Sequence, residues 1–135
     1  MAIRMFKGEF DFLSNFYIEP DNTHVEGEYQ AAKCLIPLDG FKFINLTPAK
    51  AKALGRKIPL RPDWEDVKLE VMYELCLAKF TDHRDLATKL DATGNEELIE
   101  GNYWCDWFWG VTQNGYGVGQ NHLGKILMRL RSELR

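Results

Sequence analysis

Residues 23–36 read Thr-His-Val-Glu-Gly-Glu-Tyr-Gln-Ala-Ala-Lys-Cys-Leu-Ile, and the rest of the chain is organised around them. At about 100° per residue this stretch predicts a helix with one apolar, core-facing stripe. The stripe consists of Val25, Tyr29, Ala32 and Ile36. The far side holds only small, uncharged residues, namely Gly27, Ala31 and Cys34. We therefore expect other elements to pack against this helix on several sides.

One flank of the predicted stripe is polar and carries Glu26, Gln30 and Lys33. A carboxylate, an amide and an amine are costly at the margin of a buried helix unless they are paired or face a wet pocket. Glu26 and Lys33 lie two turns apart, about 10 Å along the axis, which is too far for the usual ion pair between neighbouring turns. Both could still converge on a third group placed over Gln30. The alternative is a set of solvated surface charges, which spacing alone favours.

Length and charge bound the class of protein. A chain of 135 residues fits a single domain over 1–135 with a real core, and 45% hydrophobic and 27% charged residues are typical of globular proteins. The formal charge of -3 argues against a large basic footprint on nucleic acid, but not against a pocket for one nucleotide. Neither a membrane-length apolar run nor a cleavable signal pattern is present, so we expect a cytoplasmic protein without a membrane partner.

Cysteine and histidine usage predicts neither disulfides nor a metal site. Cys34, Cys76 and Cys105 are odd in number and form no CxxC motif, so we expect reduced core thiols. The three histidines are equally scattered.

The remaining elements are predicted from caps, periodicity and turn residues. We expect a strand over 3–6, helices over 47–55, 64–80 and 82–90, a helical turn over 95–98, an extended segment over 101–111 and a last helix from Asn121. Phe41 and Phe43 are expected to pack inward, and Asp63 to cap the helix that follows it. No repeat, low-complexity segment or linker interrupts the chain, so these features should meet in one domain.

Two features outside the first helix could hold an anion. Arg56 follows Gly55 at a predicted helix end, where it is either a surface residue that complements the helix dipole or a bidentate phosphate clamp. The Gly-rich stretch 114–120 runs into the last helix, which is either an anion site or an ordinary turn. It matches neither the Rossmann nor the Walker motif.

The aromatic residues also allow two interpretations. The segment 10–17 holds either core aromatics on a loop, which the sequence favours, or a stacking wall with Asn15 as its hydrogen-bonding group. Trp64, at the first turn of its helix, is either a core plug or the lid of a pocket. Asp106 interrupts five aromatic residues within 103–109, so it either lies at a pocket edge or has a perturbed pKa.

Several of these motifs, in this order along nearly the whole chain, resemble the NADAR (NAD- and ADP-ribose-associated) family. They begin with Leu13-Ser14-Asn15-Phe16-Tyr17, Val25-Glu26 and Tyr29-Gln30-Ala31-Ala32-Lys33. They continue with Thr47-Pro48, Ala51-Lys52, Gly55-Arg56, Trp64, Met72, Lys79-Phe80 and Trp109-Gly110, and close with Gly119-Gln120-Asn121-His122-Leu123-Gly124 and Leu127-Met128. The chain departs from the family pattern at Gly27, where a histidine is common, and at Val111, where one branch has an aspartate.

The resemblance implies a small α+β fold, mostly helical with a few short strands, and no metal or other cofactor. The family includes an N-glycosidase of phosphorylated riboflavin-biosynthesis intermediates and enzymes that remove ADP-ribose from guanine in nucleic acid. Both break an N-glycosidic bond between a phosphorylated ribose and a base-like amine. The expected substrate is therefore ADP-ribose or ribose phosphate, free or attached to nucleic acid, and single-stranded nucleic acid stays open as a partner.

The resemblance also implies roles for site residues. Three are expected to be catalytic: Glu26, Lys33 and Asp106. Glu26 would stabilise positive charge on the ribose and orient water. Lys33 would act as an acid or, with a lowered pKa, as a Schiff-base nucleophile, and Asp106 is the carboxylate nearest the family's Trp-Gly.

The residues expected to bind substrate are Asn15, Phe16, Gln30, Arg56, Trp64, Trp109, Gly110 and Asn121. Gln30 would orient a ribose hydroxyl, the two tryptophans would stack on base or sugar, and Phe16 with Asn15 would read the base edge. Arg56 and the 115–121 loop would hold phosphate.

Three function classes follow. The first is an N-glycosidase that removes ADP-ribose from guanine, with riboflavin intermediates as the alternative substrate. The second is a binding module for NAD-derived nucleotides without turnover, and the third is an interaction protein whose aromatic cluster is a partner interface.

Overall fold

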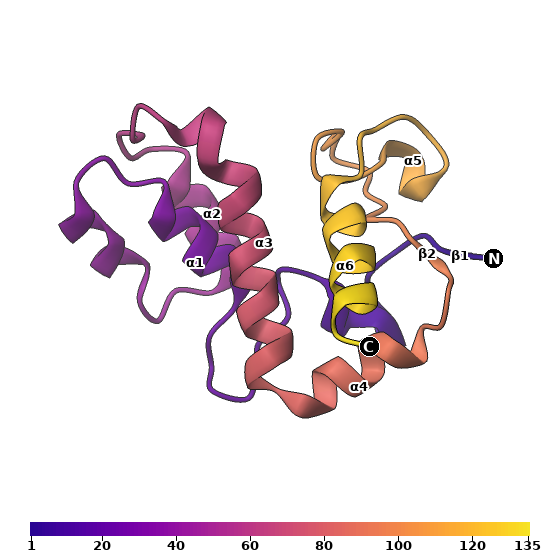
Figure 1. Cartoon of the computed structure of the whole chain (residues 1–135). Helices are drawn as coiled ribbons and strands as arrows, with labels where there is room; N and C mark the ends of the chain where they lie inside the picture. Colours follow the sequence, from indigo (N-terminus) through magenta and orange to yellow (C-terminus); the bar gives the residue numbers. More distant parts are fainter. The chain divides into compact units, whose positions relative to one another are not determined.

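The computed structural model describes residues 1–135 and divides them into two compact units. The central unit is Asn15–Lys79, and the terminal unit combines Met1–Ser14 with Phe80–Arg135. The α-helices and strands, which Figure 1 labels, are β1 (Ala2–Ile3), α1 (Val25–Ala32), α2 (Pro48–Gly55), α3 (Trp64–Asp82), α4 (Arg84–Ala92), β2 (Glu97–Leu98), α5 (Thr112–Gly115) and α6 (His122–Glu133). Two 3-10 segments, η1 (Gly8–Leu13) and η2 (Pro37–Phe43), complete the order. This confirms the predicted α+β class, mostly helical with short strands. None of the helices has the length and apolarity needed to span a bilayer.

In the central unit, α1 packs against α2 and the 3-10 segment η2. His24 caps α1, because its Nδ1 accepts the Gly27 N–H at 2.9 Å while Nε2 donates to the Leu46 carbonyl at 2.8 Å. The predicted stripe is right for Val25 and Tyr29, which are buried, but wrong for Ile36, which is 50% exposed.

The first helix is shorter than predicted because the chain leaves it to pair with another segment. Cys34 forms an antiparallel bridge with Leu60, and the Leu35 N–H donates to the Pro59 carbonyl at 3.0 Å. Backbone pairing therefore ends α1 at Ala32, with Lys33 as the C-cap.

The predicted second helix is confirmed at its N-cap and in its end at Gly55–Arg56, although the C-cap is Arg56 and not the glycine. The Thr47 hydroxyl accepts the Lys50 N–H at 3.2 Å, Pro48 opens α2 and Arg56 closes it. Ala51 of α2 belongs to a small buried core with Cys34 and Phe43. Phe41 is 68% exposed, so its predicted inward packing is wrong. On a 3-10 helix, residues i and i+2 point to different sides, so Phe41 and Phe43 cannot both face the core.

The long helix α3 begins at Trp64 as predicted, but it buries one face and not two. The buried apolar residues are Trp64, Met72, Cys76 and Phe80, whereas the residues 67, 71 and 75 of the predicted first stripe are only half-buried. The Asp63 carboxylate accepts from the Arg61 guanidinium at 2.6 and 2.9 Å, and its role as the cap of α3 stays a prediction. Burial raises the pKa of the Cys76 thiol to about 12.

In the terminal unit, β1 and β2 form a parallel pair with Ala2 opposite Glu97 and Ile3 opposite Leu98. The predicted helical turn over 95–98 is therefore wrong, because the ladder with β1 and the burial of Leu98 favour a strand. Helix α6 packs on β2 and α4 through an apolar face of Leu123, Leu127 and Leu130.

The predicted extended segment over 101–111 is also wrong. Only a single bridge, Gly101 to Val111, is strand-like, and turns fill the interval. Cys105 lies there with a left-handed φ of 66° and is exposed, unlike the buried free thiols Cys34 and Cys76. The prediction of a core thiol at Cys105 therefore fails.

Candidate functional site

A buried carboxylate and a buried amide lie one turn apart on α1. Gln30 Nε2 donates to Glu26 Oε1 at 2.8 Å, and the two residues are 4% and 7% exposed, respectively. The Glu26 N–H donates to the Asn15 carbonyl at 3.0 Å, which ties the start of the helix to the preceding loop. The predicted polar flank is therefore an internal group and not a solvated surface.

Lys33 follows at the C-cap of α1 and is half-buried. Burial lowers the pKa of its amine; Glu26 opposes this shift, and Arg56, Lys52 and Lys68 add to it. This lowering of the Lys33 pKa is in the direction that a Schiff-base nucleophile requires. A larger fraction of neutral amine is present near neutral pH than in an ordinary lysine.

The three cations that act on Lys33 come from α2 and α3. Lys52 lies in the last turn of α2 with its Nζ 5.8 Å from the Phe16 ring centroid, and Arg56 is the C-cap of the same helix. Lys68, from α3, forms an ion pair with Glu65 at 2.7 Å. An excess of positive charge beside a single buried carboxylate suits an anionic ligand.

Sequence reasoning assigned no role to Lys52 or Lys68. The four-residue spacing of Lys52 and Arg56 on the predicted α2 could have indicated a shared helix face. No sequence signal relates Lys68 to Lys33, because their proximity depends on how α3 packs.

The aromatic residues of the central unit differ in accessibility. Trp64 is 4% exposed and its ring centroid lies 5.0 Å from that of Tyr29, at an interplanar angle of 57°. Of the two interpretations of Trp64, this geometry favours the core plug. Phe16 is 42% exposed, and Asn15 Nδ2 lies 3.5 Å from Met72 Sδ. Of the aromatic residues predicted to bind substrate in this unit, Phe16 is therefore the one with an accessible ring.

The other predicted site residues, Asp106, Trp109, Gly110 and Asn121, lie in the terminal unit. Asp106 Oδ1 accepts the N–H groups of Phe108 at 3.2 Å and Trp109 at 3.0 Å. The Trp109 ring meets Phe108 edge to face, with centroids 4.8 Å apart. The Asp106 carboxylate thus orders the turn that carries the aromatic residues.

Gly110 and Asn121 also serve the backbone of this unit. A Cβ at Gly110 would overlap the Glu100 carboxylate, which explains the absence of a side chain there. Asn121 Oδ1 accepts the Glu100 N–H at 2.9 Å, and its Nδ2 donates to the Leu98 carbonyl at 2.9 Å. Both groups of the Asn121 side chain are therefore occupied by the main chain.

Several N–H groups of the Gly-rich loop already have partners within the chain. The N–H of Gly117 donates to the Thr112 carbonyl at 2.9 Å, that of Val118 to Thr112 Oγ1 at 3.0 Å, and that of Gln120 to the Trp107 carbonyl at 2.7 Å. Asn121 likewise donates its N–H to Gly110. These four bonds close the loop on itself, so of the two interpretations they favour the ordinary turn, while phosphate binding by 115–121 stays a prediction.

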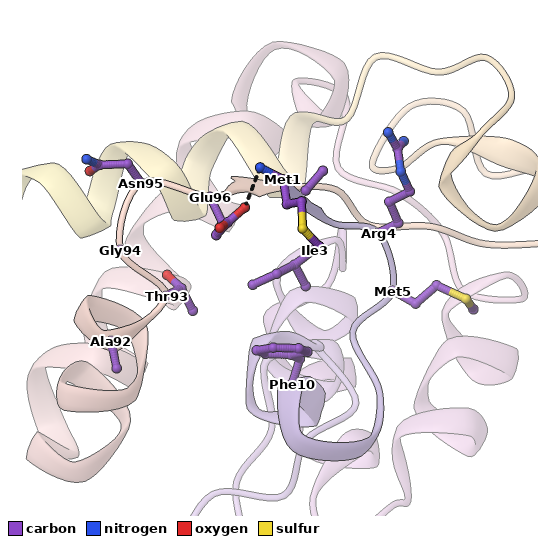
Figure 2. Close-up of a pocket in the computed structure, with 11 residues that line it drawn as sticks. Met1, Ile3, Arg4, Met5, Phe10, Ala92, Thr93, Gly94, Asn95 and Glu96 are labelled. Atoms are coloured by element: carbon purple, nitrogen blue, oxygen red, sulfur yellow. Dashed lines mark ion pairs between the residues drawn. The ribbon is translucent and has the colours of Figure 1, made fainter.

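A pocket of about 610 Å³ in the terminal unit lies between β1, η1 and the turn after α4. In Figure 2, Ile3 and Phe10 form an apolar wall opposite Thr93 and Glu96. The Met1 ammonium pairs with Glu96 at 3.1 Å. None of the predicted site residues lines this pocket, so it is separate from the Glu26–Lys33 group.

The chain matches the NADAR domain over residues 7–135. It is 43% identical over 120 residues to N-glycosidase Npun_R5314 of Nostoc punctiforme, a match that covers 82% of this chain and 73% of the relative. It is also 45% identical over 142 residues to riboflavin biosynthesis protein VVA0006 of Vibrio vulnificus, covering 92% of this chain and 35% of that protein.

A solved structure has the same fold. The NMR structure of the Escherichia coli protein YbiA superposes with a TM-score of 0.82 at 33% identity, covering 99% of this chain and 83% of that one. The sequence match to E. coli N-glycosidase YbiA is 41% over 90 residues and spans 54% of that protein. The chain thus spans about half to three quarters of the bacterial N-glycosidases it matches, and a smaller part of the riboflavin protein.

Proposed function

Since the chain belongs to the NADAR family, we propose that it is an N-glycosidase that hydrolyses the bond between a phosphorylated ribose and a base-like amine. One observation carries the proposal: Lys33, with its lowered pKa, interacts with buried Glu26 inside a group of three further cations. The names of two relatives as N-glycosidases support the same reaction class.

In this proposal Glu26 acts on the ribose. Breaking the glycosidic C–N bond sends its electron pair to nitrogen and leaves positive charge on C1 and the ring oxygen, as in glycoside hydrolysis. The Glu26 carboxylate stabilises that charge and accepts a proton from the water that attacks C1. Gln30 already occupies Oε1, so we assign Oε2 to this task.

Lys33 acts on the departing amine by one of two routes. In the first, its ammonium donates a proton to the leaving nitrogen, while water supplies the new hydroxyl on C1. In the second, the neutral amine attacks C1 of a ring-opened ribose, the base leaves with its electron pair and a proton, and water then hydrolyses the resulting imine. The lowered pKa favours both routes, because it makes the ammonium a stronger acid and the neutral amine more abundant.

Phosphate binding falls to Arg56, with Lys52 and Lys68 adding charge. The accessible ring of Phe16, next to Asn15, is our candidate for stacking on the base. Asp106 remains a second candidate carboxylate through Oδ2, since Oδ1 is held by two backbone N–H groups. Burial favours Glu26 over Asp106, because a carboxylate acts more strongly where water is excluded.

Two substrates are to be distinguished. The first is ADP-ribosylated guanine in nucleic acid or nucleotide. The second, favoured by the relative named as a riboflavin biosynthesis protein, is a phosphorylated riboflavin intermediate. Both present a phosphorylated ribose to the cations and a base to Phe16.

The test is incubation of the protein with ADP-ribosylated guanine DNA and, separately, with a phosphorylated riboflavin intermediate, followed by chromatography. We expect release of ADP-ribose from the DNA, or of base and ribose phosphate from the riboflavin intermediate, and loss of this release in Glu26→Gln. Tight ADP-ribose binding without release from either substrate would support a binding module instead. Neither binding nor release would leave the interaction-protein class.

The imine route has its own test. Borohydride reduction during turnover should trap a covalent adduct on the wild-type protein and not on Lys33→Ala. Turnover without an adduct would favour the proton-donor route.

A further inference from the structure

We propose that Gln30 is a positioning residue: it holds the Glu26 carboxylate in its working orientation, and the missing side chain of Gly55 makes room for it to do so. The inference rests on the proposed role of Glu26 and adds Gly55, which the sequence related only to the end of α2. It also replaces the expected contact between Gln30 and a ribose hydroxyl.

The first step is the direction of the Gln30 amide. Its Nε2 donates to Glu26 Oε1 at 2.8 Å, and the residue is 4% exposed. A side chain this buried, with its amide NH₂ group directed at Glu26, is not placed to reach a substrate hydroxyl. It is placed to fix a carboxylate, because a hydrogen bond from a buried amide restricts the rotation of its acceptor.

The second step concerns the other end of the amide. Gln30 Oε1 is buried and has no hydrogen-bond partner. Buried polar atoms are nearly always bonded, so an exception needs a reason. Here the bond to Glu26 requires the amide orientation that leaves Oε1 against Gly55. The free-energy cost of leaving this oxygen without a hydrogen bond is therefore a consequence of fixing the Glu26 carboxylate.

The third step explains Gly55. It is the last residue of α2 and is buried, and its φ is not in the left-handed region, so the backbone does not require glycine. A Cβ built there would overlap Gln30 Oε1 and lie 2.6 Å from Gln30 Cδ. Any side chain at position 55 therefore pushes the amide out of its place beside Glu26.

The experiment uses two single variants, their double variant and a control. Gly55→Ala should displace the Gln30 amide, and Gln30→Ala should remove it. Each should lower kcat about 10-fold or more with KM changed less than about twofold, because orientation of Glu26 matters at the reacting centre. In the double variant, Gly55→Ala should cost nothing further, because no amide is left to displace.

Gly40→Ala is the matched control. Gly40 also lies in the central unit, and a Cβ there meets nothing closer than Ala31 at 3.9 Å. It should leave kcat, KM and thermal stability unchanged. Circular dichroism melting of every variant shows whether a loss of kcat reflects unfolding.

A readout without turnover separates this inference from the proposed function. The side-chain NH₂ cross-peaks of Gln30 in ¹⁵N–¹H NMR spectra should show one proton protected from exchange in the wild type and in Gly40→Ala. The protection should disappear in Gly55→Ala and in Glu26→Ala. If the wild type releases no base but these spectra behave as stated, the proposed function fails and the positioning contact stands.

Three outcomes would overturn the inference. One is a folded Gly55→Ala protein whose Gln30 amide stays protected. Another is an increase in KM with kcat unchanged, which would indicate that Gln30 binds substrate. The third is additive losses in the double variant, which would show that Gly55 and Gln30 act independently.

Discussion

Both units bury carboxamide side chains, but the two units use them differently. In the terminal unit, Asn102 donates to the Asp106 carbonyl at 2.8 Å and to Glu100 Oε2 at 3.0 Å, and accepts the Asp106 N–H at 3.0 Å. Asn121 is similarly bonded to the backbone. In the central unit, Gln30 bonds a catalytic candidate and leaves its oxygen unpartnered.

The contrast separates structural from chemical use of the same functional group. Amides whose polar atoms are satisfied by main chain hold irregular segments in place, as along 98–121. An amide that is only partly satisfied, beside a buried carboxylate and a lysine with a lowered pKa, indicates a site. We therefore expect substitutions in the central unit to change activity and those in the terminal unit to change stability.

The largest effect is expected for the two candidate carboxylates. Glu26→Gln keeps an acceptor for Gln30 but removes the negative charge, so kcat/KM should fall about 10²–10⁴-fold. Asp106→Asn keeps an oxygen for the N–H groups of Phe108 and Trp109, and should cost less than about 10-fold. Product release measured by chromatography shows which carboxylate is catalytic. Equal losses of kcat/KM in the two variants would contradict the assignment of activity to the central unit.

The next effect is on stability and lies in the terminal unit. Asn121→Ala leaves the Glu100 N–H and the Leu98 carbonyl without their partners, so the free energy of unfolding should fall by about 2–4 kcal/mol. Urea denaturation followed by circular dichroism measures this. Glu26→Gln is the reference variant and should change the same quantity by less than about 1 kcal/mol. A stable Asn121→Ala protein would refute the structural role of this amide.

What the sequence could predict follows the same division. Local chemistry placed α2 through Thr47, Pro48 and Gly55, and helical spacing put Glu26 and Gln30 on one buried flank. These features depend on neighbours within one turn. The same spacing placed Lys33 on that flank, and the family resemblance added its catalytic role; its pKa is lowered, as the Schiff-base role requires.

Several of the predictions that failed depend on contacts between distant segments. The pairing of Cys34 with Leu60 shortened α1, and the pairing of β1 with β2 turned 97–98 into a strand. The Gly-rich loop left two interpretations open because a sequence does not show that Thr112 binds its N–H groups. Likewise, only the packing of α3 relates Lys68 to Lys33.

Lys33→Met should raise the stability of the protein at neutral pH, by less than Asn121→Ala lowers it. Because the folded-state pKa of Lys33 is lowered, the unfolded chain binds more protons between that pKa and 10.5. The wild type therefore gains stability as pH rises through this window, and the charged amine destabilises it below. Lys33→Met should melt a few degrees higher than wild type at neutral pH, with base release abolished. Melting curves from pH 7 to pH 10.5 should show the difference narrowing, whereas a constant or widening difference would contradict the lowered pKa.

The smallest effect compares two exposed arginines, one from each unit. Arg56→Gln removes a cation that acts on Lys33, whereas Arg129→Gln removes an exposed pair with Glu133 at 3.2 Å in the other unit. An exposed charge contributes about 0.2–1 kcal/mol, so Arg56→Gln should raise KM for a phosphorylated ribose up to about fivefold, and Arg129→Gln should not change it. Salt screens such charges, so the difference should shrink when KM is measured in 1 M instead of 0.05 M NaCl. If Arg129→Gln raised KM equally, the effect would reflect the net charge of the whole protein, and the proposal of a local phosphate site at Arg56 would be contradicted.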